Sequence, residues 1–257
     1  MRFSGKNVVV SGGASGLGRA SATRFLRDGA GHVFLFDIDE AGGKRTEEEL
    51  REYGPVHFIW CDVCNEESVK EAYRMAVEIA GSVDIVHANA GIITKPCTID
   101  KMSLPEWNKV ISINLNGMFL MAKYAVAQML KQEGGSIVFT GSNWAYVCDP
   151  GFTSYAASKG GVVAFARALA LDHAKDNIRI NVVCPGNIQS PLLERQLSEE
   201  PDPKEALEAM GQISTPEEIA NLVAFLASDE ASAMKGSAVI IDQGETLGYR
   251  PGLRVLK

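Results

Sequence analysis

Residues 11–18 decide the fold of this chain, and they read Ser11-Gly12-Gly13-Ala14-Ser15-Gly16-Leu17-Gly18. An apolar run typical of a buried strand (residues 7–11) precedes them, and an amphipathic helical pattern (16–28) follows. Glycines between a strand and a helix let the backbone approach a pyrophosphate at the helix N-terminus, where the dipole favours negative charge. The glycine spacing is G-x-x-x-G-x-G, and the Gly-Lys-Ser/Thr ending of a P-loop is missing. The context predicts dinucleotide binding, with a plain glycine loop as the alternative.

The same alternation of short apolar runs and helical patterns continues along the chain. The runs are rich in Val, Ile and Phe without strict polar alternation, which is typical of strands covered on both faces. The predicted strands are residues 7–11, 33–36, 56–60, 83–87, 137–140, 178–183 and 238–241. The predicted helices are residues 16–28, 41–53, 66–80, 105–130, 153–174 and 216–227. This order predicts an α/β fold: a Rossmann-type, doubly wound parallel sheet of about seven strands with helices on both faces.

No linker or repeat divides the pattern, so we expect one domain over residues 1–257. One long irregular stretch is predicted at residues 187–212, after the sixth strand, where open α/β sheets bind ligands. We therefore expect a substrate-binding loop or lid over residues 186–213. A C-terminal tail (245–257) follows the last strand, as a subunit contact or a frayed end.

Asp37 ends the second predicted strand, 21 positions after Gly16. A carboxylate at this place accepts hydrogen bonds from the adenosine ribose hydroxyls and repels a 2′-phosphate. NAD is therefore favoured over NADP. The alternative is that Asp37 or Asp39 caps the following helix.

Tyr155 and Lys159 lie four residues apart at the start of a helical pattern, so they share one face. A free tyrosine has a pKa near ~10, and a neighbouring ammonium together with a cationic nicotinamide would lower it. A solvated Tyr–Lys pair is the alternative.

Composition excludes several classes of protein. The 257 residues are 46% hydrophobic and 22% charged, with a net charge of −7 and no dense Lys/Arg cluster, so we expect no nucleic-acid partner. No secretory signal and no ~18-residue uninterrupted apolar span is visible, so we expect no membrane partner and a cytoplasmic location. The five cysteines and four histidines lack ligand spacing, and the Cys61-x-x-Cys64 pair is interpreted as structural thiols, so no metal site is expected.

Further motifs occur in a fixed order. They are Asp62-Val63, Ala88-Asn89-Ala90-Gly91, an Asn at 114, Ser142 after the fifth strand, Tyr155-x-x-x-Lys159 and Pro185-Gly186. With residues 11–18, they resemble the short-chain dehydrogenase/reductase family in its single-domain branch of about 250 residues. The resemblance covers nearly the full length and departs in three places: Ser11 for Thr, Ala88 for Asn, and Asp242-Gln243-Gly244 for Asp-Gly-Gly.

The resemblance implies a role for each matching residue. Tyr155 would be the general acid/base, Lys159 would lower its pKa and hold the nicotinamide ribose, Ser142 would bind the substrate oxygen, and Asn114 would anchor a proton-conducting water. The implied cofactor-binding residues are Ser11, Gly12, Ser15, Gly16, Leu17, Gly18, Asp37, Asp62, Val63, Asn89, Ala90, Gly91, Tyr155, Lys159, Pro185, Gly186, Ile188 and Ser190. The predicted substrate-binding residues are Ser142, Trp144, Cys148, Tyr155, Asn187 and Leu192.

The predicted function is that of an NAD-dependent oxidoreductase that interconverts a secondary alcohol and a ketone. The mixed pocket lining favours a compact polar substrate, such as a sugar, polyol, hydroxy acid or alicyclic alcohol. The alternatives are an NADPH-dependent carbonyl or 3-oxoacyl-type reductase on the same fold and a non-catalytic cofactor-binding regulator. The resemblance also implies a homo-oligomer, either a tetramer or a dimer.

Overall fold

Within residues 1–198 and 202–248, which the computed structural model describes, seven strands form one sheet in the order β3-β2-β1-β4-β5-β6-β7. Every neighbouring pair is parallel. The strands are β1 (Asn7–Ser11), β2 (His32–Asp37), β3 (Val56–Trp60), β4 (Ile85–Ala88), β5 (Gly135–Thr140), β6 (Ile178–Pro185) and β7 (Ala238–Ile241). The strand order reverses between β1 and β4, so a crevice opens at the carboxyl ends of these two strands. The predicted doubly wound sheet is confirmed.

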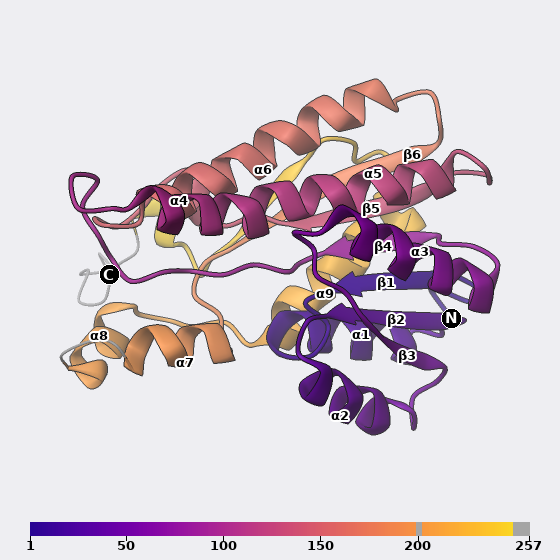
Figure 1. Ribbon diagram of the computed structural model, residues 1–257, viewed down its shortest axis with the longest axis horizontal. Coiled ribbons are helices and arrows are strands. Elements are labelled where there is room, and N and C mark those ends of the chain that lie inside the picture. The colour runs from indigo at the N-terminus through magenta and orange to yellow at the C-terminus, as the bar shows by residue number, and fades with distance from the viewer. Residues whose placement is uncertain (199–201, 249–257) are drawn as a thin grey trace, which may run out of the picture.

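Helices cover both faces of this sheet (Figure 1). One hydrophobic cluster joins the sheet to α3, α5 and α6, and a second joins its other face to α1, α2 and α9. The helices are α1 (Gly16–Arg27), α2 (Glu40–Leu50), α3 (Glu66–Ala80), α4 (Leu104–Ile111), α5 (Gly117–Met129), α6 (Thr153–Asp172), α7 (Pro191–Ser198), α8 (Pro203–Ala209) and α9 (Pro216–Ala227). Burial on both faces explains why the strands are mostly apolar; all eight residues of β6 are buried, including the polar Arg179 and Asn181.

Two helix starts follow directly from the sequence. Ser103 caps α4 and Thr215 caps α9, each with a full capping box closed by the Glu three residues later, Glu106 and Glu218. A proline lies at the first or second position of both helices. The predicted starts of these helices are confirmed to within one residue.

The predicted helix 105–130 is interrupted by a turn of π-helix at Ser112–Asn116, between α4 and α5. The whole segment Leu104–Met129 is long and apolar enough to cross a membrane, with a mean hydropathy of 1.3, but half of its most apolar window is buried in the protein. Its apolar character is therefore explained by packing of α5 against the sheet. Asn114 lies within this π turn and is buried.

The prediction that residues 187–212 are irregular is wrong, because α7 and α8 lie in this stretch. Pro191 begins α7, while Asp202 caps α8 through its Oδ1 and precedes Pro203 at the helix start. These are ordinary helix-start signals in a segment too short for clear periodicity. Both helices lie beyond the carboxyl ends of the strands, away from the N-terminus (Figure 1). Residues 199–201, and residues 249–257 of the predicted tail, lie outside the described part of the chain.

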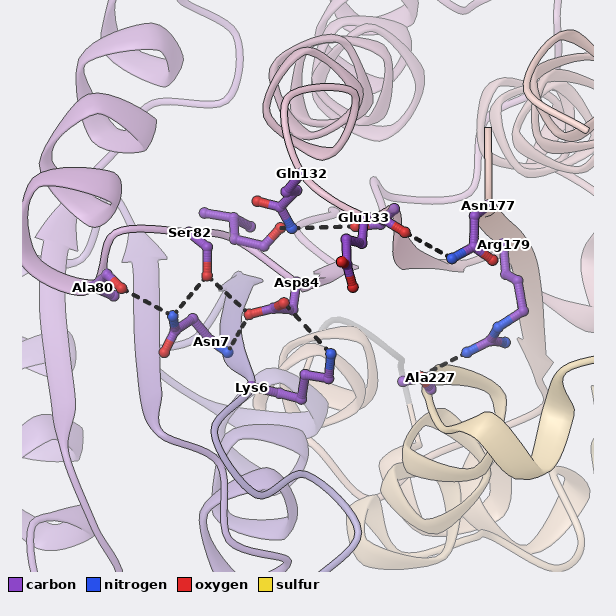
Figure 2. A network of polar contacts seen from close by, with 12 residues as sticks. Lys6, Asn7, Ala80, Ser82, Asp84, Gln132, Glu133, Asn177, Arg179 and Ala227 are labelled. Atoms are coloured by element: carbon purple, nitrogen blue, oxygen red, sulfur yellow. Dashed lines mark hydrogen bonds and ion pairs between the residues drawn. The ribbon is translucent and has the colours of Figure 1, made fainter. Parts of the chain in front are cut away.

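At the opposite end of the sheet, where the strands begin, polar side chains form hydrogen bonds between neighbouring segments (Figure 2). The Asn7 side chain donates to the Ala80 carbonyl and to Ser82 Oγ, and its backbone N–H donates to Asp84 at 2.9 Å. On β6, the buried Arg179 donates to the carbonyls of Leu226, Ala227 and Ala231, where α9 ends. These bonds satisfy buried backbone groups that have no partner within a helix or strand. We interpret this end as the stabilising end, which leaves the carboxyl end for chemistry.

Candidate active site

A cavity of about 700 Å³ opens at the carboxyl ends of the strands. We call it the strand-end cavity, and its walls come from the loops after β1 to β6, from α6 and from the start of α7. A larger groove of about 980 Å³ lies between α1, α2 and α9, but several of its charged side chains pair with one another, as Arg19 does with Glu49 at 2.6 Å and Arg24 with Asp28 at 3.0 Å. The strand-end cavity is therefore the candidate site.

Residues 11–18 form a tight loop at one end of this cavity, and we call them the dinucleotide loop. Gly12 has a φ of +67°, and a Cβ there would lie 2.9 Å from Asn89 Nδ2. A Cβ on Gly18 would lie only 1.9 Å from the Gly12 carbonyl oxygen, so the loop and α1 touch backbone to backbone. Ser15 precedes α1 without a side-chain cap, and the first turn of α1 holds no acidic residue. The open N-terminus of a twelve-residue helix suits a pyrophosphate, so these residues fit a dinucleotide.

Two members of the predicted cofactor set lie behind this surface. Ser11 is buried, and its Oγ accepts from the backbone N–H groups of Asn89 at 2.9 Å and Ala90 at 3.1 Å. Ser11 therefore joins β1 to β4 without lining the cavity, and Gly18 acts through its close backbone approach. The other predicted cofactor residues all line the cavity: Gly12, Ser15, Gly16, Leu17, Asp37, Asp62, Val63, Asn89, Ala90, Gly91, Tyr155, Lys159, Pro185, Gly186, Ile188 and Ser190.

The structure shows which of Asp37 and Asp39 caps the helix that follows β2. Asp39 is the N-cap of α2 and accepts from Gly42 N–H. Asp37 lies at the end of β2 in the cavity wall, where Oδ2 accepts from Ala14 N–H and Oδ1 from Asp39 N–H, both at 3.0 Å. Each carboxylate oxygen of Asp37 keeps lone-pair capacity for a further donor. Asp62, at the end of β3, is the third carboxylate in this part of the wall.

Ser142, Tyr155 and Lys159 meet at the other end of the cavity. Lys159 is buried on α6, donates to the Thr140 carbonyl at 2.8 Å and lies 5.6 Å from the centre of the Tyr155 ring. Burial lowers the pKa of Lys159 to about 8. Burial also raises the pKa of Tyr155 to about 12, and a hydrogen bond with Ser142 opposes this rise. Without a bound cofactor, burial is therefore the largest influence on the Tyr155 pKa, and Ser142 is the neighbour that opposes it. That Lys159 lowers the Tyr155 pKa stays a prediction.

Asn114 is fully buried in the π turn and does not line the cavity. Its Oδ1 accepts from Ile92 N–H at 2.8 Å, while Nδ2 donates to the Ile92 carbonyl and to Ser158 Oγ. Both Asn114 and Lys159 lie next to Gly91. A Cβ on Gly91 would lie 3.4 Å from Asn114 Oδ1 and 3.6 Å from Lys159 Nζ. Asn114 is therefore close to Lys159 without bonding to it directly.

The predicted substrate residues share one wall, with one exception. Trp144 packs edge-on against Tyr155, with 5.6 Å between ring centres, and it also contacts Phe152 at 4.8 Å. Asn187 and Leu192 line the same cavity. Cys148 is exposed and does not line the cavity, so the prediction that it is a substrate-binding residue is wrong. The 3-10 turn Asn143–Ala145 follows Ser142, and the cavity lining has no member between Trp144 and Tyr155.

Several cavity residues were not predicted. Thr140 is the last residue of β5, so the strand-end rule could have identified it. Other members lie beside predicted residues and carry no motif of their own; they include Ile38, Cys61, Ile93 and Asn143. Cys61 and Cys64 both line the cavity as free thiols, and burial raises the pKa of Cys61 to about 12. Such a thiol stays protonated and unreactive at neutral pH.

Comparison with known proteins places this geometry in a family. A family model described as enoyl-(acyl carrier protein) reductase matches residues 12–246. Cyclopentanol dehydrogenase from Comamonas sp. is 37% identical over 250 residues, which cover 95% of this chain and 98% of that protein. The crystal structure of levodione reductase has a TM-score of 0.92 at 33% identity, covering 96% of this chain and 100% of that one. The 3-ketoacyl-(acyl-carrier-protein) reductase from Brucella melitensis, complexed with NADH, has a TM-score of 0.86 at 29% identity, covering 95% and 99%.

The matched region includes residues 12–18 of the dinucleotide loop, the Ser142, Tyr155 and Lys159 group, and every strand of the sheet after β1. The chain belongs to the short-chain dehydrogenase/reductase family, whose members are oxidoreductases that bind a nicotinamide cofactor.

Proposed function

We propose that this protein is an NAD-dependent oxidoreductase that interconverts a compact secondary alcohol and its ketone. One observation carries the proposal: Asp37, the dinucleotide loop, Ser142, Tyr155 and Lys159 all border one continuous cavity. A cofactor that extends from Asp37 across the dinucleotide loop would bring its reactive end to Tyr155. A non-catalytic regulator would have no need of this group of three polar side chains.

Charge supports NAD over NADP. The cavity wall near the end of β2 holds the carboxylates of Asp37, Asp39 and Asp62, while its two basic residues, Lys159 and Arg195, lie on α6 and α7. A 2′-phosphate on the adenosine ribose would therefore approach three negative charges without a basic partner. The Brucella reductase, a structural neighbour, was crystallised as an NADH complex, which agrees with this choice.

Proton transfer falls to Tyr155. When bound, the nicotinamide accepts a hydride from the alcohol carbon or returns it to the ketone. In oxidation, Tyr155 accepts the alcohol's hydroxyl proton, and in reduction it returns that proton to the carbonyl oxygen. Ser142 Oγ donates to the same substrate oxygen, and the nearby charge of Lys159 favours the phenolate form of Tyr155. The hydride and the proton together account for the two hydrogens that the alcohol loses.

The substrate wall favours a compact ring or a short chain with a second polar group. Trp144 and Leu192 supply apolar surface, and Asn187 supplies an amide. The names of two similar proteins, cyclopentanol dehydrogenase and levodione reductase, agree with this choice. We also propose a homo-oligomer, as the family resemblance implies, and a cytoplasmic location.

A panel of alcohols tests the proposal, with NAD and NADP compared for each one by the change in absorbance of the reduced cofactor. We expect oxidation of at least one compact secondary alcohol, with kcat/KM for NAD at least about tenfold above that for NADP. Clear preference for NADPH with a 3-oxoacyl substrate would instead support the biosynthetic reductase. Tight NADH binding without turnover of any alcohol or ketone would support a regulator.

A further inference from the structure

His87 lies at the centre of the sheet and has no part in the mechanism above. It is on β4 between β1 and β5, and its side chain is fully buried. Burial lowers the pKa of His87 to about 3, so the ring is neutral at physiological pH. A buried polar ring in a central strand calls for an explanation, because an apolar residue of similar size would need no hydrogen-bond partner.

The hydrogen bonds around Thr140 determine which ring nitrogen of His87 carries the proton. Thr140 Oγ1 donates its single hydrogen to Asn89 Oδ1 at 3.1 Å. The His87 Nε2 atom lies 2.9 Å from the same Oγ1, so it must be the donor in that contact. Nδ1 is then the unprotonated nitrogen, and it has no hydrogen-bond partner among the described residues. The ring therefore serves one neighbour, Thr140, through Nε2–H.

The bond from Thr140 continues to the dinucleotide loop through Asn89. Because Asn89 Oδ1 accepts from Thr140, its Nδ2 faces the loop and donates to the carbonyls of Ser11 at 3.2 Å and Gly12 at 3.5 Å. The reversed amide would place an oxygen against these two carbonyl oxygens. Polar contacts thus run from His87 through Thr140 and Asn89 to residues 11 and 12, across the ends of β4, β5 and β1.

We propose that His87 is a positioning residue for cofactor binding, which fixes the Thr140 hydroxyl and thereby the Asn89 amide against the dinucleotide loop. The inference rests on the proposed function only in requiring that the loop binds a nicotinamide dinucleotide. Without the His87 donor, the Thr140 hydroxyl is free to rotate and the Asn89 amide to turn over. The binding-competent loop is then populated for only part of the time, and the apparent Kd rises by the inverse of that fraction.

Three substitutions at His87 separate positioning from packing. A glutamine carries its amide nitrogen the same number of bonds from Cα as His Nε2, whereas asparagine matches Nδ1, and leucine offers no donor. We expect H87L and H87N to raise the Kd for NADH by about three- to tenfold, the equivalent of one neutral hydrogen bond. H87Q should stay within about twofold of the wild type. NADH fluorescence titration measures the Kd, and thermal unfolding of each variant measures stability separately.

Ser136→Ala is the matched control, because Ser136 is a buried, unpartnered polar residue on β5 that does not line the cavity. It should leave NADH affinity unchanged. Equal affinities of the Leu, Asn and Gln variants for NADH would overturn the inference, as would a loss of stability without a change in Kd.

A second pair of variants serves if the His87 variants do not fold. Thr140→Val removes the hydroxyl that His87 bonds, and Thr140→Ser keeps it. Weaker NADH binding by the Val variant alone then supports the inference, and equal binding contradicts it. Absence of NADH binding by the wild type would instead contradict the proposed function as well.

Discussion

The ammonium nitrogen of Lys159 lies 5.6 Å from the centre of the Tyr155 ring, and both side chains border the same cavity. Burial raises the pKa of Tyr155 to about 12 and lowers that of Lys159 to about 8. Desolvation opposes charge on both groups, so the protein alone holds Tyr155 as a neutral phenol at pH 7. The phenolate that the proposed oxidation requires would therefore need the positive charge of Lys159 together with that of a bound oxidised nicotinamide.

This arrangement predicts the pH dependence of Tyr155. In the protein without added cofactor, no Tyr155 phenolate should form below about pH 10, two units under the pKa of about 12. The absorbance difference between wild type and Tyr155→Phe measures this ionisation. Saturation with NAD should shift it to lower pH. Oxidation should become faster as pH rises, because it needs the base, and reduction should slow, because it needs the acid. A phenolate midpoint near pH 7 without cofactor would contradict the account.

Asp37 should set the choice of cofactor. Asp37→Asn removes the charge but keeps an acceptor for Ala14 N–H, which the present carboxylate bonds at 3.0 Å. We expect the ratio of kcat/KM for NAD to that for NADP to fall about 10- to 100-fold, because charged hydrogen bonds to the ribose and repulsion of the phosphate are both lost. Steady-state rates with both cofactors measure the ratio. Asp39→Asn, which keeps a capping side chain on α2, should change it less. An unchanged ratio in the Asp37 variant would show that another residue selects the cofactor.

The sequence predicts the sheet well because each strand contains a run of apolar residues and many of the loops carry a recognisable motif. It could not reveal that α4 and α5 are divided by a π turn, because the hydrogen bond from Ile92 N–H to Asn114 in that turn joins residues that lie 22 positions apart in the sequence. Ser11 stands where the family motif has Thr, and its hydrogen bonds to the backbone of Asn89 and Ala90, just after β4, appear only once the strands are paired. Cys148 was selected by its position along the chain, which does not specify the direction of the loop. His87 lies in a run of residues that predicts a strand. That pattern does not show that its ring contacts Thr140 on the next strand.

Arg179 should matter for stability and not for turnover. Its guanidinium donates to three carbonyls near the end of α9, at 2.7 Å for Leu226, 2.8 Å for Ala227 and 3.3 Å for Ala231. Arg179→Met leaves these groups without that donor and should lower the free energy of unfolding by about 2–4 kcal/mol. Urea denaturation measures this change. Arg51→Met, at an exposed ion pair, should cost less than about 0.5 kcal/mol. Equal effects of the two variants would refute the stabilising role of the amino-terminal end.

Acid should destabilise the wild type partly through His87. Its folded-state pKa of about 3 lies below the value of 6.5 expected when unfolded, so the unfolded chain binds the extra proton between these values. Stability from this group is complete above pH 6.5 and falls as pH drops, by at most about 1.4 kcal/mol per pH unit. The burial that lowers the pKa of His57 acts in the same direction. In His87→Gln the acid dependence should be shallower, as measured by unfolding free energies from pH 7 to 4. Parallel curves for the two proteins would contradict the assignment.

Proton transfer by Tyr155 is the central step of the proposed mechanism. It is tested by comparing the turnover of the wild type and of Tyr155→Phe on the alcohol from the panel that reacts fastest. The substitution removes one oxygen and keeps the ring that packs against Trp144. We predict a fall in kcat of at least about 10³-fold, while NADH binds with an unchanged Kd and the protein unfolds at the same temperature within a few degrees. Retained turnover in the Phe variant would show that Tyr155 does not transfer the proton, and the proposed mechanism would fail.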